Sequence, residues 1–200
     1  ETYQAFPYGQ AEGIVAGEGD DVYFGTYGSA VIHRLNTKTL KDEVLFNLLD
    51  DYGQDRTYIM QYQDDLLLIG TIPFYGKLGG ALAIYNPKTN TKTVHTNIIK
   101  NQSIVGLAKK GNLIFGSTTI RGGLDADPSQ MAKEPVIFIW DMDQEKVIKE
   151  IKLPFEETKN SPLISGLTFD DKGQLWGVSD GVIFTMDPNT YEFTKHKNIY

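Results

Sequence analysis

Polar and aromatic side chains gather just before and just after short apolar runs in this sequence. Four pairs precede such a run: Gln10 and Glu12, Asp55 and Arg56, Asn101 and Gln102, Asn160 and Ser161. Four further residues come after such an apolar run: Tyr27, Tyr75, Lys77 and Arg121. Amide and guanidinium groups exchange hydrogen bonds with hydroxyls or grip carboxylates, and tyrosine rings can stack on a sugar ring. The mixture favours a polyhydroxylated ligand.

A structural role competes with binding at each position, because Asn, Ser and Asp at the starts of strands often bond the backbone of turns. Asp55 and Arg56 could belong to an ion pair between repeats, and the Gly79-Gly80 and Gly122-Gly123 pairs could merely permit positive φ. For the surface as a whole we favour binding. The ligand-binding residues that we predict are Gln10, Asp55, Arg56, Tyr75, Lys77, Asn101, Gln102 and Arg121.

Catalysis has weaker support, so we favour a binding protein over an enzyme. The three histidines fall on different predicted strands, which disfavours a histidine-based metal site or a Ser-His-Asp triad. Asp125 and Asp127 alternate as in a calcium loop, but the sixth-position Gly and terminal Glu of an EF-hand are missing. We predict no metal and no cofactor. The enzymatic alternative is a polysaccharide hydrolase using two of Glu12, Asp55 and Asp125, or a lyase using Tyr75 as base beside Arg121.

An internal repeat positions these residues. A glycine ends an apolar run at Gly25, Gly70, Gly116 and Gly177. Another run follows and ends in Asn or Asp before a turn: "NTKT", "NPKT", "DMDQ" and "DPNT". Asx first and Pro second suit a type I turn. With one apolar run before each glycine and one after each turn, every repeat reads as four short antiparallel strands.

Four such strands in each repeat of roughly 45 to 60 residues predict an all-β fold, a β-propeller whose repeats are its blades. A β-sandwich with coincidental similarity is the alternative. We place the blades at approximately 12–49, 56–99, 102–153 and 162–198, in a single domain or segment over 1–200. Residues 1–9 read as a strand of a preceding blade. We therefore favour part of a larger six- to eight-bladed ring over a closed four-bladed one.

The segments "GKLGGALAIYNP", "NQSIVGLA" and "GLTFDDKGQLWG" resemble bacterial multi-bladed propellers of the WD40/YVTN/SMP-30-like superfamily. They are most similar to uncharacterised exported proteins of Gram-positive bacteria. The resemblance implies the fold and an extracellular or cell-surface location. The Gly-His and Trp-Asp dipeptides of WD40 repeats are not kept, apart from Trp140-Asp141, so it implies no WD40-type partner.

Loop lengths indicate which face carries function. The connections between second and third strands span 26–29, 71–79, 117–134 and 178–180, whereas the hairpin turns at the opposite face are short. Long loops on a rigid scaffold commonly carry binding sites. We expect the eighteen residues 117–134 to build a wall around a site. We expect Trp140 and Trp176, which lie within predicted strands, to be core residues that pack between neighbouring blades.

The composition of the chain limits the classes of molecule that we expect it to bind. The net charge is −7, which disfavours a non-specific nucleic-acid binder, and no apolar run is long enough for membrane insertion. The chain has no cysteine, which excludes disulfides and thiolate metal sites. It starts at Glu1, which reads as a processed or trimmed start. The expected partner is a polysaccharide or oligosaccharide; the alternatives are a protein partner and self-association through open blade edges.

Overall fold

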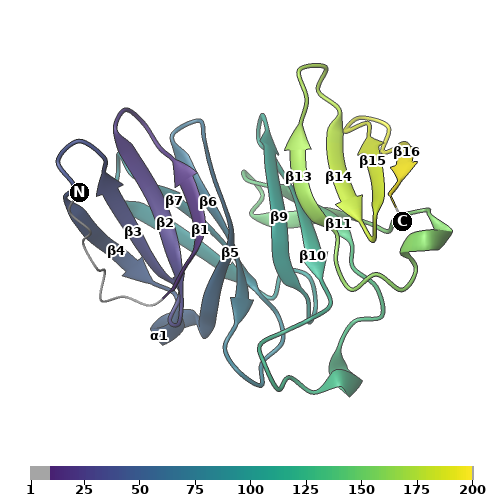
Figure 1. The fold of residues 1–200 in the computed structure, drawn as a ribbon, viewed down its shortest axis with the longest axis horizontal. Helices are drawn as coiled ribbons and strands as arrows, with labels where there is room; N and C mark the ends of the chain where they lie inside the picture. The colour runs from purple at the N-terminus through teal and green to yellow at the C-terminus, as the bar shows by residue number, and fades with distance from the viewer. Residues whose placement is uncertain (1–9, 200) are drawn as a thin grey trace.

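The computed structural model describes residues 10–199, and almost all of its regular structure is antiparallel strand (Figure 1). The predicted strand within residues 1–9 lies outside the described residues. In chain order the strands are β1 (Gln10–Ala16), β2 (Asp21–Tyr27), β3 (Val31–Asn36), β4 (Asp42–Asn47), β5 (Gln54–Gln63), β6 (Leu66–Pro73), β7 (Ala81–Asn86), β8 (Thr91–Thr96), β9 (Ser103–Lys110), β10 (Leu113–Thr119), β11 (Ile137–Asp141), β12 (Lys146–Ile151), β13 (Ser165–Phe169), β14 (Leu175–Ser179), β15 (Val182–Met186) and β16 (Phe193–Asn198).

Three single helical turns join the strands. They are α1 (Leu49–Tyr52), η1 (Pro128–Gln130) and η2 (Glu156–Thr158). Each is too short to form a layer, so the layers of the described residues are sheets alone.

The strands form four blades of four strands each: β1–β4, β5–β8, β9–β12 and β13–β16. Within every blade each strand pairs antiparallel with the next one along the chain. One antiparallel bridge between β2 and β5, at Tyr27 and Arg56, also joins the first two blades into an eight-stranded sheet. The prediction of an all-β propeller with four antiparallel blades is confirmed.

The first strands of the blades stand in a row. β1 contacts β5, β5 contacts β9, and β9 contacts β13, while β13 and β1 make no comparable contact among the described residues. Figure 1 shows the four sheets side by side along an open arc. That this arc is part of a larger ring stays a prediction.

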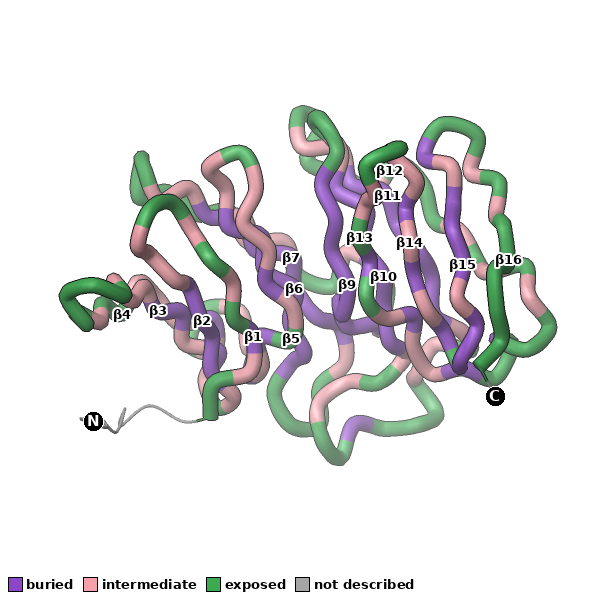
Figure 2. Tube along the Cα trace, turned by 45° about the horizontal axis from the view of Figure 1, so that its top comes forward, coloured by how far each residue is buried: buried purple, intermediate pink, exposed green. Residues whose placement is uncertain are grey.

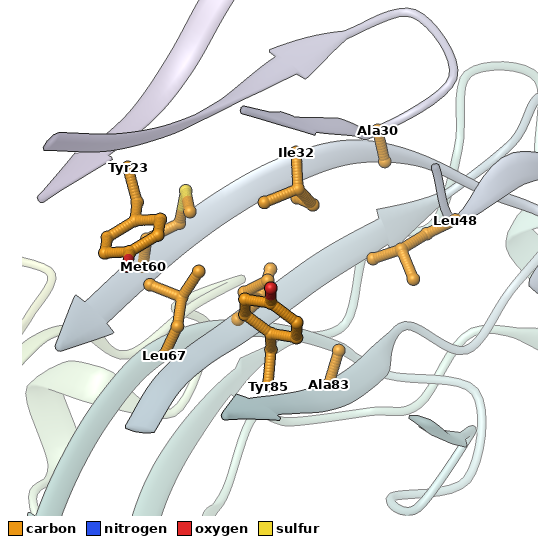
Figure 3. Close-up of a cluster of buried hydrophobic side chains, with 9 residues drawn as sticks. Tyr23, Ala30, Ile32, Leu48, Met60, Leu67, Ala83 and Tyr85 are labelled. Carbon is orange, nitrogen blue, oxygen red and sulfur yellow. The ribbon is translucent and has the colours of Figure 1, made fainter. Parts of the chain in front are cut away.

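Consecutive blades bury apolar side chains between their faces. Tyr23 of the first blade packs with Met60 and Leu67 of the second, as Figure 3 shows. Leu68 of the second blade packs with Phe138 of the third, and further clusters of this kind join the third and fourth blades. In Figure 2 the buried segments run along the middle of the sheets, and the exposed segments are mainly turns and outer strands. Burying one such side chain contributes roughly 1.5 to 3 kcal/mol.

The two tryptophans differ in their packing. Trp140 is 3% exposed and lies in the core between the second and third blades, as predicted. Trp176 is only partly buried; its ring stacks on His196, with centroids 4.6 Å apart, and its indole N–H donates to Asp170 at 2.8 Å. Its neighbour Leu175 points into the core beside the third blade, so strand alternation directs Trp176 to the opposite face. Among the described residues Trp176 therefore does not lie in a core between two blades, whereas the sequence predicted such packing for both tryptophans.

The four predicted Asx turns are present. In each blade the Oδ1 atom of the last residue of the third run accepts backbone N–H groups two and three residues later; these residues are Asn36, Asn86, Asp141 and Asp187. The bonds are between 2.7 and 3.2 Å long. Two of the four caps can be protonated and two cannot, so acid should affect only half of these turns.

We predict that Asp141→Asn/Asp187→Asn reduces the loss of stability in acid. Backbone hydrogen bonds from Gln144 and Asn189 hold the pKa values of Asp141 and Asp187 below the usual value for an aspartate. Their contribution is therefore present above the unfolded-state pKa and is lost as pH falls through the lower folded-state pKa. The difference in Tm between pH 7 and pH 3 should shrink in the double variant. The natural asparagines at positions 36 and 86 show that Asn fits the turn, and an unchanged difference in Tm would contradict the prediction.

Candidate functional site

The long connection before β11 packs onto the connection after β6. The Gly76 N–H donates to the Leu124 carbonyl at 2.7 Å, and the Gly123 N–H donates to the Lys77 carbonyl at 3.0 Å. A Cβ atom on Gly123 would lie 2.2 Å from the Phe74 carbonyl oxygen, and one on Gly122 would lie 2.3 Å from that of Lys77. Gly122 and Gly123 do not have positive φ, so close approach of the two loops requires them.

Asn101 and Gln102 hold the other end of the same connection. The Asn101 side-chain amide donates to the Gln130 carbonyl at 2.8 Å, and that of Gln102 donates to the Glu134 carbonyl at 3.2 Å. Gln102 is 7% exposed and also accepts a hydrogen bond from the Thr118 hydroxyl. Both predicted ligand-binding amides are therefore engaged in positioning the loop.

Gln54 has the matching role in the second blade, although it was not among the predicted residues. Its Oε1 accepts from the Thr71 hydroxyl at 2.7 Å, and the Thr71 Oγ1 accepts from the Ala81 N–H at 2.8 Å. The Thr118 Oγ1 accepts from the Val136 N–H at the same length, 2.8 Å. The signal in the sequence was a Gln at or just before the start of the first strand of the blade, together with a Thr near the end of the second strand.

Asp55 supports a turn from inside. It is 4% exposed, and its Oδ1 accepts from the Ser29 N–H at 3.0 Å. Its backbone carbonyl accepts from the Ala30 N–H, also at 3.0 Å. Gly28, Ser29 and Ala30 all have positive φ, of 83°, 72° and 42°. The carboxylate thus holds a strained turn and is directed away from solvent.

Arg56 forms an ion pair across the first two blades, and its partner is Glu12. The guanidinium Nε lies 3.2 and 3.1 Å from the two Glu12 carboxylate oxygens, and Nη2 lies 2.5 Å from Oε1. Hydrogen bonding to Glu12 raises the pKa of Arg56 above the usual value for an arginine. The Arg56 side chain is still 34% exposed, and its Cζ lies 4.6 Å from the centre of the Tyr27 ring. An inter-blade ion pair was the structural alternative for this region.

Tyr27 links this ion pair to Tyr75. The two phenol oxygens are 2.6 Å apart, and this hydrogen bond, followed by desolvation, raises the pKa of Tyr27. The Tyr75 ring is 5.3 Å from that of Phe74, centre to centre, and both residues are about two-fifths exposed, at 43% and 40%. We call the sequence of contacts Glu12–Arg56–Tyr27–Tyr75–Phe74 the ligand row.

Two hollows lie along the ligand row. Tyr27, Arg56 and Tyr75, together with the backbone of Gly122 to Leu124, line a cavity of about 30 Å³, which is about the volume of one water molecule. A sugar ring cannot enter it. The other hollow, of about 360 Å³, lies between β1 and β5 and is lined by Gln10, Ala11, Glu12 and Tyr58. That volume lies within the usual range for small-molecule sites.

The eight predicted residues thus separate into groups. Gln10, Arg56 and Tyr75 lie on or beside the ligand row. Asp55 is buried next to it and holds the turn at Ser29. Asn101 and Gln102 hold the long loop. Lys77 and Arg121 are exposed and line neither hollow, although their neighbours carry the contact between the loops. Tyr27, Tyr58 and Phe74 complete the surface, and among them only Tyr27 stood out in the sequence.

The part of the chain that the structure describes contains no candidate metal site and no candidate membrane-spanning helix. No group of three or more His, Asp or Glu side chains in this range could hold a metal ion. Asp127 instead caps η1, where its carboxylate accepts from the Ser129 N–H at 2.9 Å and the Gln130 amide at 3.1 Å. No helix in the described part of the chain is long and apolar enough to cross a membrane.

Comparison with known proteins supports the fold alone. No family model and no curated protein matches the chain. Among solved structures, a streptogramin B lyase matches with a TM-score of 0.68 at 14% identity, over 96% of this chain and 56% of that one. A luciferin-regenerating enzyme matches with a TM-score of 0.65 at 14% identity, over 94% of this chain and 63% of that one. The Pan2 WD40 domain of Neurospora crassa matches with a TM-score of 0.62 at 13% identity, over 95% and 50%.

This chain therefore spans between half and two thirds of the length of each of these three neighbours. All are less than 25% identical to it. The likeness establishes a propeller fold of the kind shared by enzymes and WD40 proteins.

We predict that Gly123→Ala separates the two loops. Its Cβ would overlap the Phe74 carbonyl oxygen, and overpacking of this kind typically costs about 1 to 3 kcal/mol. Hydrogen exchange at the Gly76 and Gly123 amides should accelerate, because each donates across the contact. Lys133→Ala, at an exposed position in the same loop, is the control. Unchanged exchange at both amides would show that the contact tolerates a methyl group.

Proposed function

We propose that this protein binds carbohydrate along the ligand row, with one sugar unit in the hollow between β1 and β5. The single observation that carries the proposal is the continuity of the row, from the Glu12–Arg56 ion pair through the bonded phenols of Tyr27 and Tyr75 to Phe74. Exposed aromatic rings beside fixed hydrogen-bonding groups suit a ligand with apolar ring faces and many hydroxyls.

The row is held in place before any ligand arrives. Arg56 is fixed by Glu12, Tyr27 by Arg56 and Tyr75, and the Tyr75 connection by the long loop. A rigid site pays less conformational entropy on binding. We propose that the long loop serves to brace Tyr75 and Phe74, and that the protein acts outside the cell or at its surface, where polysaccharides are met.

A protein partner is the second candidate. Leu124 is 56% exposed next to Phe74 and Tyr75, so an apolar patch adjoins the polar row. Exposed apolar patches rimmed by polar groups commonly mark protein interfaces. This alternative predicts that Leu124→Ala weakens binding as much as Tyr75→Ala does.

Catalysis is less well supported by this arrangement. The Glu12 carboxylate accepts from Arg56, and Asp55 is buried and accepts from the Ser29 N–H. A glycosidase needs one carboxyl to donate a proton while another attacks or activates water. In the lyase alternative the base is Tyr75, whose hydroxyl is engaged in a hydrogen bond with that of Tyr27 at 2.6 Å. A hydrolase or lyase activity would therefore need groups other than these.

We predict that polysaccharide retards this protein in affinity electrophoresis, and that Tyr75→Ala and Tyr58→Ala each weaken the interaction roughly tenfold, about 1.4 kcal/mol. Gels containing neutral and acidic polysaccharides would be compared. Ile148→Ala, an exposed apolar change on outer strand β12, is the control.

Retardation that both tyrosine variants retain would place the site elsewhere. No retardation of the folded protein by any polymer would favour the protein partner, and the Leu124→Ala variant then becomes the decisive one.

A further inference from the structure

We propose a second binding site, for a small hydroxylated carboxylate, at the opposite end of the inner strands. It is a hollow of about 220 Å³ lined by Gln61, Gln63, Ala108, Lys109, Thr168 and Phe169. These residues come from β5, β9 and β13, three neighbouring inner strands. On β5, Gln61 is five residues beyond Arg56, about 17 Å along a strand, so the hollow is separate from the ligand row.

Lys109 is the charged group that lines this hollow. Its side chain is 7% exposed, and its only side-chain partner among the described residues is the Asp64 carboxylate, 2.5 Å from Nζ. Lysine is almost never fully buried without a partner. An ammonium has three N–H donors, of which Asp64 takes one. Since unbonded buried donors carry a desolvation cost, an incoming carboxylate oxygen would satisfy them.

Two amides face the ammonium across the blade boundary. Lys109 pairs with Ile114, and Gln61 with Leu68, and both of these partners lie in the core between the second and third blades. Gln61 and Gln63 are half-buried, and their side chains have no hydrogen-bond partner within residues 10–199. Each amide can both donate to and accept from a hydroxyl. The ligand class is therefore a carboxylate that also carries hydroxyl groups.

Lys109 is the only charged residue among those that line the hollow, so the lining itself favours an anion although the whole chain is acidic. Lys110 lies 5.3 Å from the centre of the Phe169 ring and donates to the Gly173 carbonyl. Lys109 pairs with Asp64, and the charge of Lys110 is balanced by that of the nearby Asp170 in a chain of net charge −7. The Asp170 carboxylate accepts hydrogen bonds from the Trp176 indole N–H and from the turn N–H groups of Lys172 and Gln174. Phe169 supplies an apolar wall.

The competing explanation is that Lys109 and Asp64 form only a structural ion pair between blades. The two explanations predict opposite effects of Asp64→Asn. If the pair is purely structural, the change removes a partner and creates no affinity for anions. If the hollow binds a carboxylate, the change removes a competing anion from Lys109, so binding becomes tighter.

The test is a titration of the full chain, followed by amide chemical shifts in NMR, with acetate, lactate and glucuronate as probes and glucose as the uncharged control. We expect lactate or glucuronate to shift the amides of Gln61, Gln63 and Phe169, with acetate binding more weakly and glucose causing no such shift. Lys109→Met should weaken binding at least tenfold, and Asp64→Asn should tighten it at least threefold. Lys110→Met is the matched control and should have a smaller effect than Lys109→Met.

The proposal is overturned if none of the three carboxylates shifts these amides, if glucose binds equally well, or if Asp64→Asn fails to tighten binding. Asp64 is a turn residue that is 62% exposed, so this variant keeps the test decisive even if Lys109→Met does not fold. Tyr75→Ala should leave binding here unchanged, which separates this site from the proposed carbohydrate site.

Discussion

The face-to-face burial of consecutive sheets is the constraint on which the rest of this structure depends. A four-stranded sheet cannot bury its own apolar faces, so each blade gains its stability from its neighbours. Leu68 and Phe138 meet in this way, as do Tyr23 and Leu67. Because the blades are stacked in one direction, their first strands form a row, and both ends of that row are fixed by the same packing.

Hydrogen bonds of buried side chains fix the loops to the stacked sheets. A hydroxyl at the end of the second strand bonds the start of the third, and in the two middle blades a glutamine before the first strand bonds that hydroxyl. Buried polar groups must be satisfied, and these contacts are made at the same place in the second and third blades. The long loop can then rest on its neighbour through Gly122 and Gly123, where only a glycine fits. The proposed carbohydrate site and the proposed carboxylate site occupy opposite ends of this frame.

Much of the architecture was predictable because it depends on local rules that recur. The Asx residues at 36, 86, 141 and 187 cap turns in the structure as they do in the pattern. His33, His95 and His196 lie on β3, β8 and β16, on the expected strands. Trp176 departed from expectation because a core residue and a residue facing outward are one position apart on a strand. The sequence alone does not distinguish a half-buried tryptophan on that face from a fully buried one, because the difference depends on which residues pack against it.

The sequence by itself determined the fold class, the repeat and the face with long loops, since turn chemistry and strand alternation act over a few residues. It did not decide which polar side chains at that face are free. Gln102 and Asp55 are buried in loop contacts, Arg56 pairs with Glu12 44 residues earlier, and Tyr27 reaches Tyr75. Lys109 meets Asp64 in the same way. The Gln102 contacts lie within the third blade, but the other pairings join different blades, so they depend on how one sheet is stacked on the next, and only the tertiary structure fixes that.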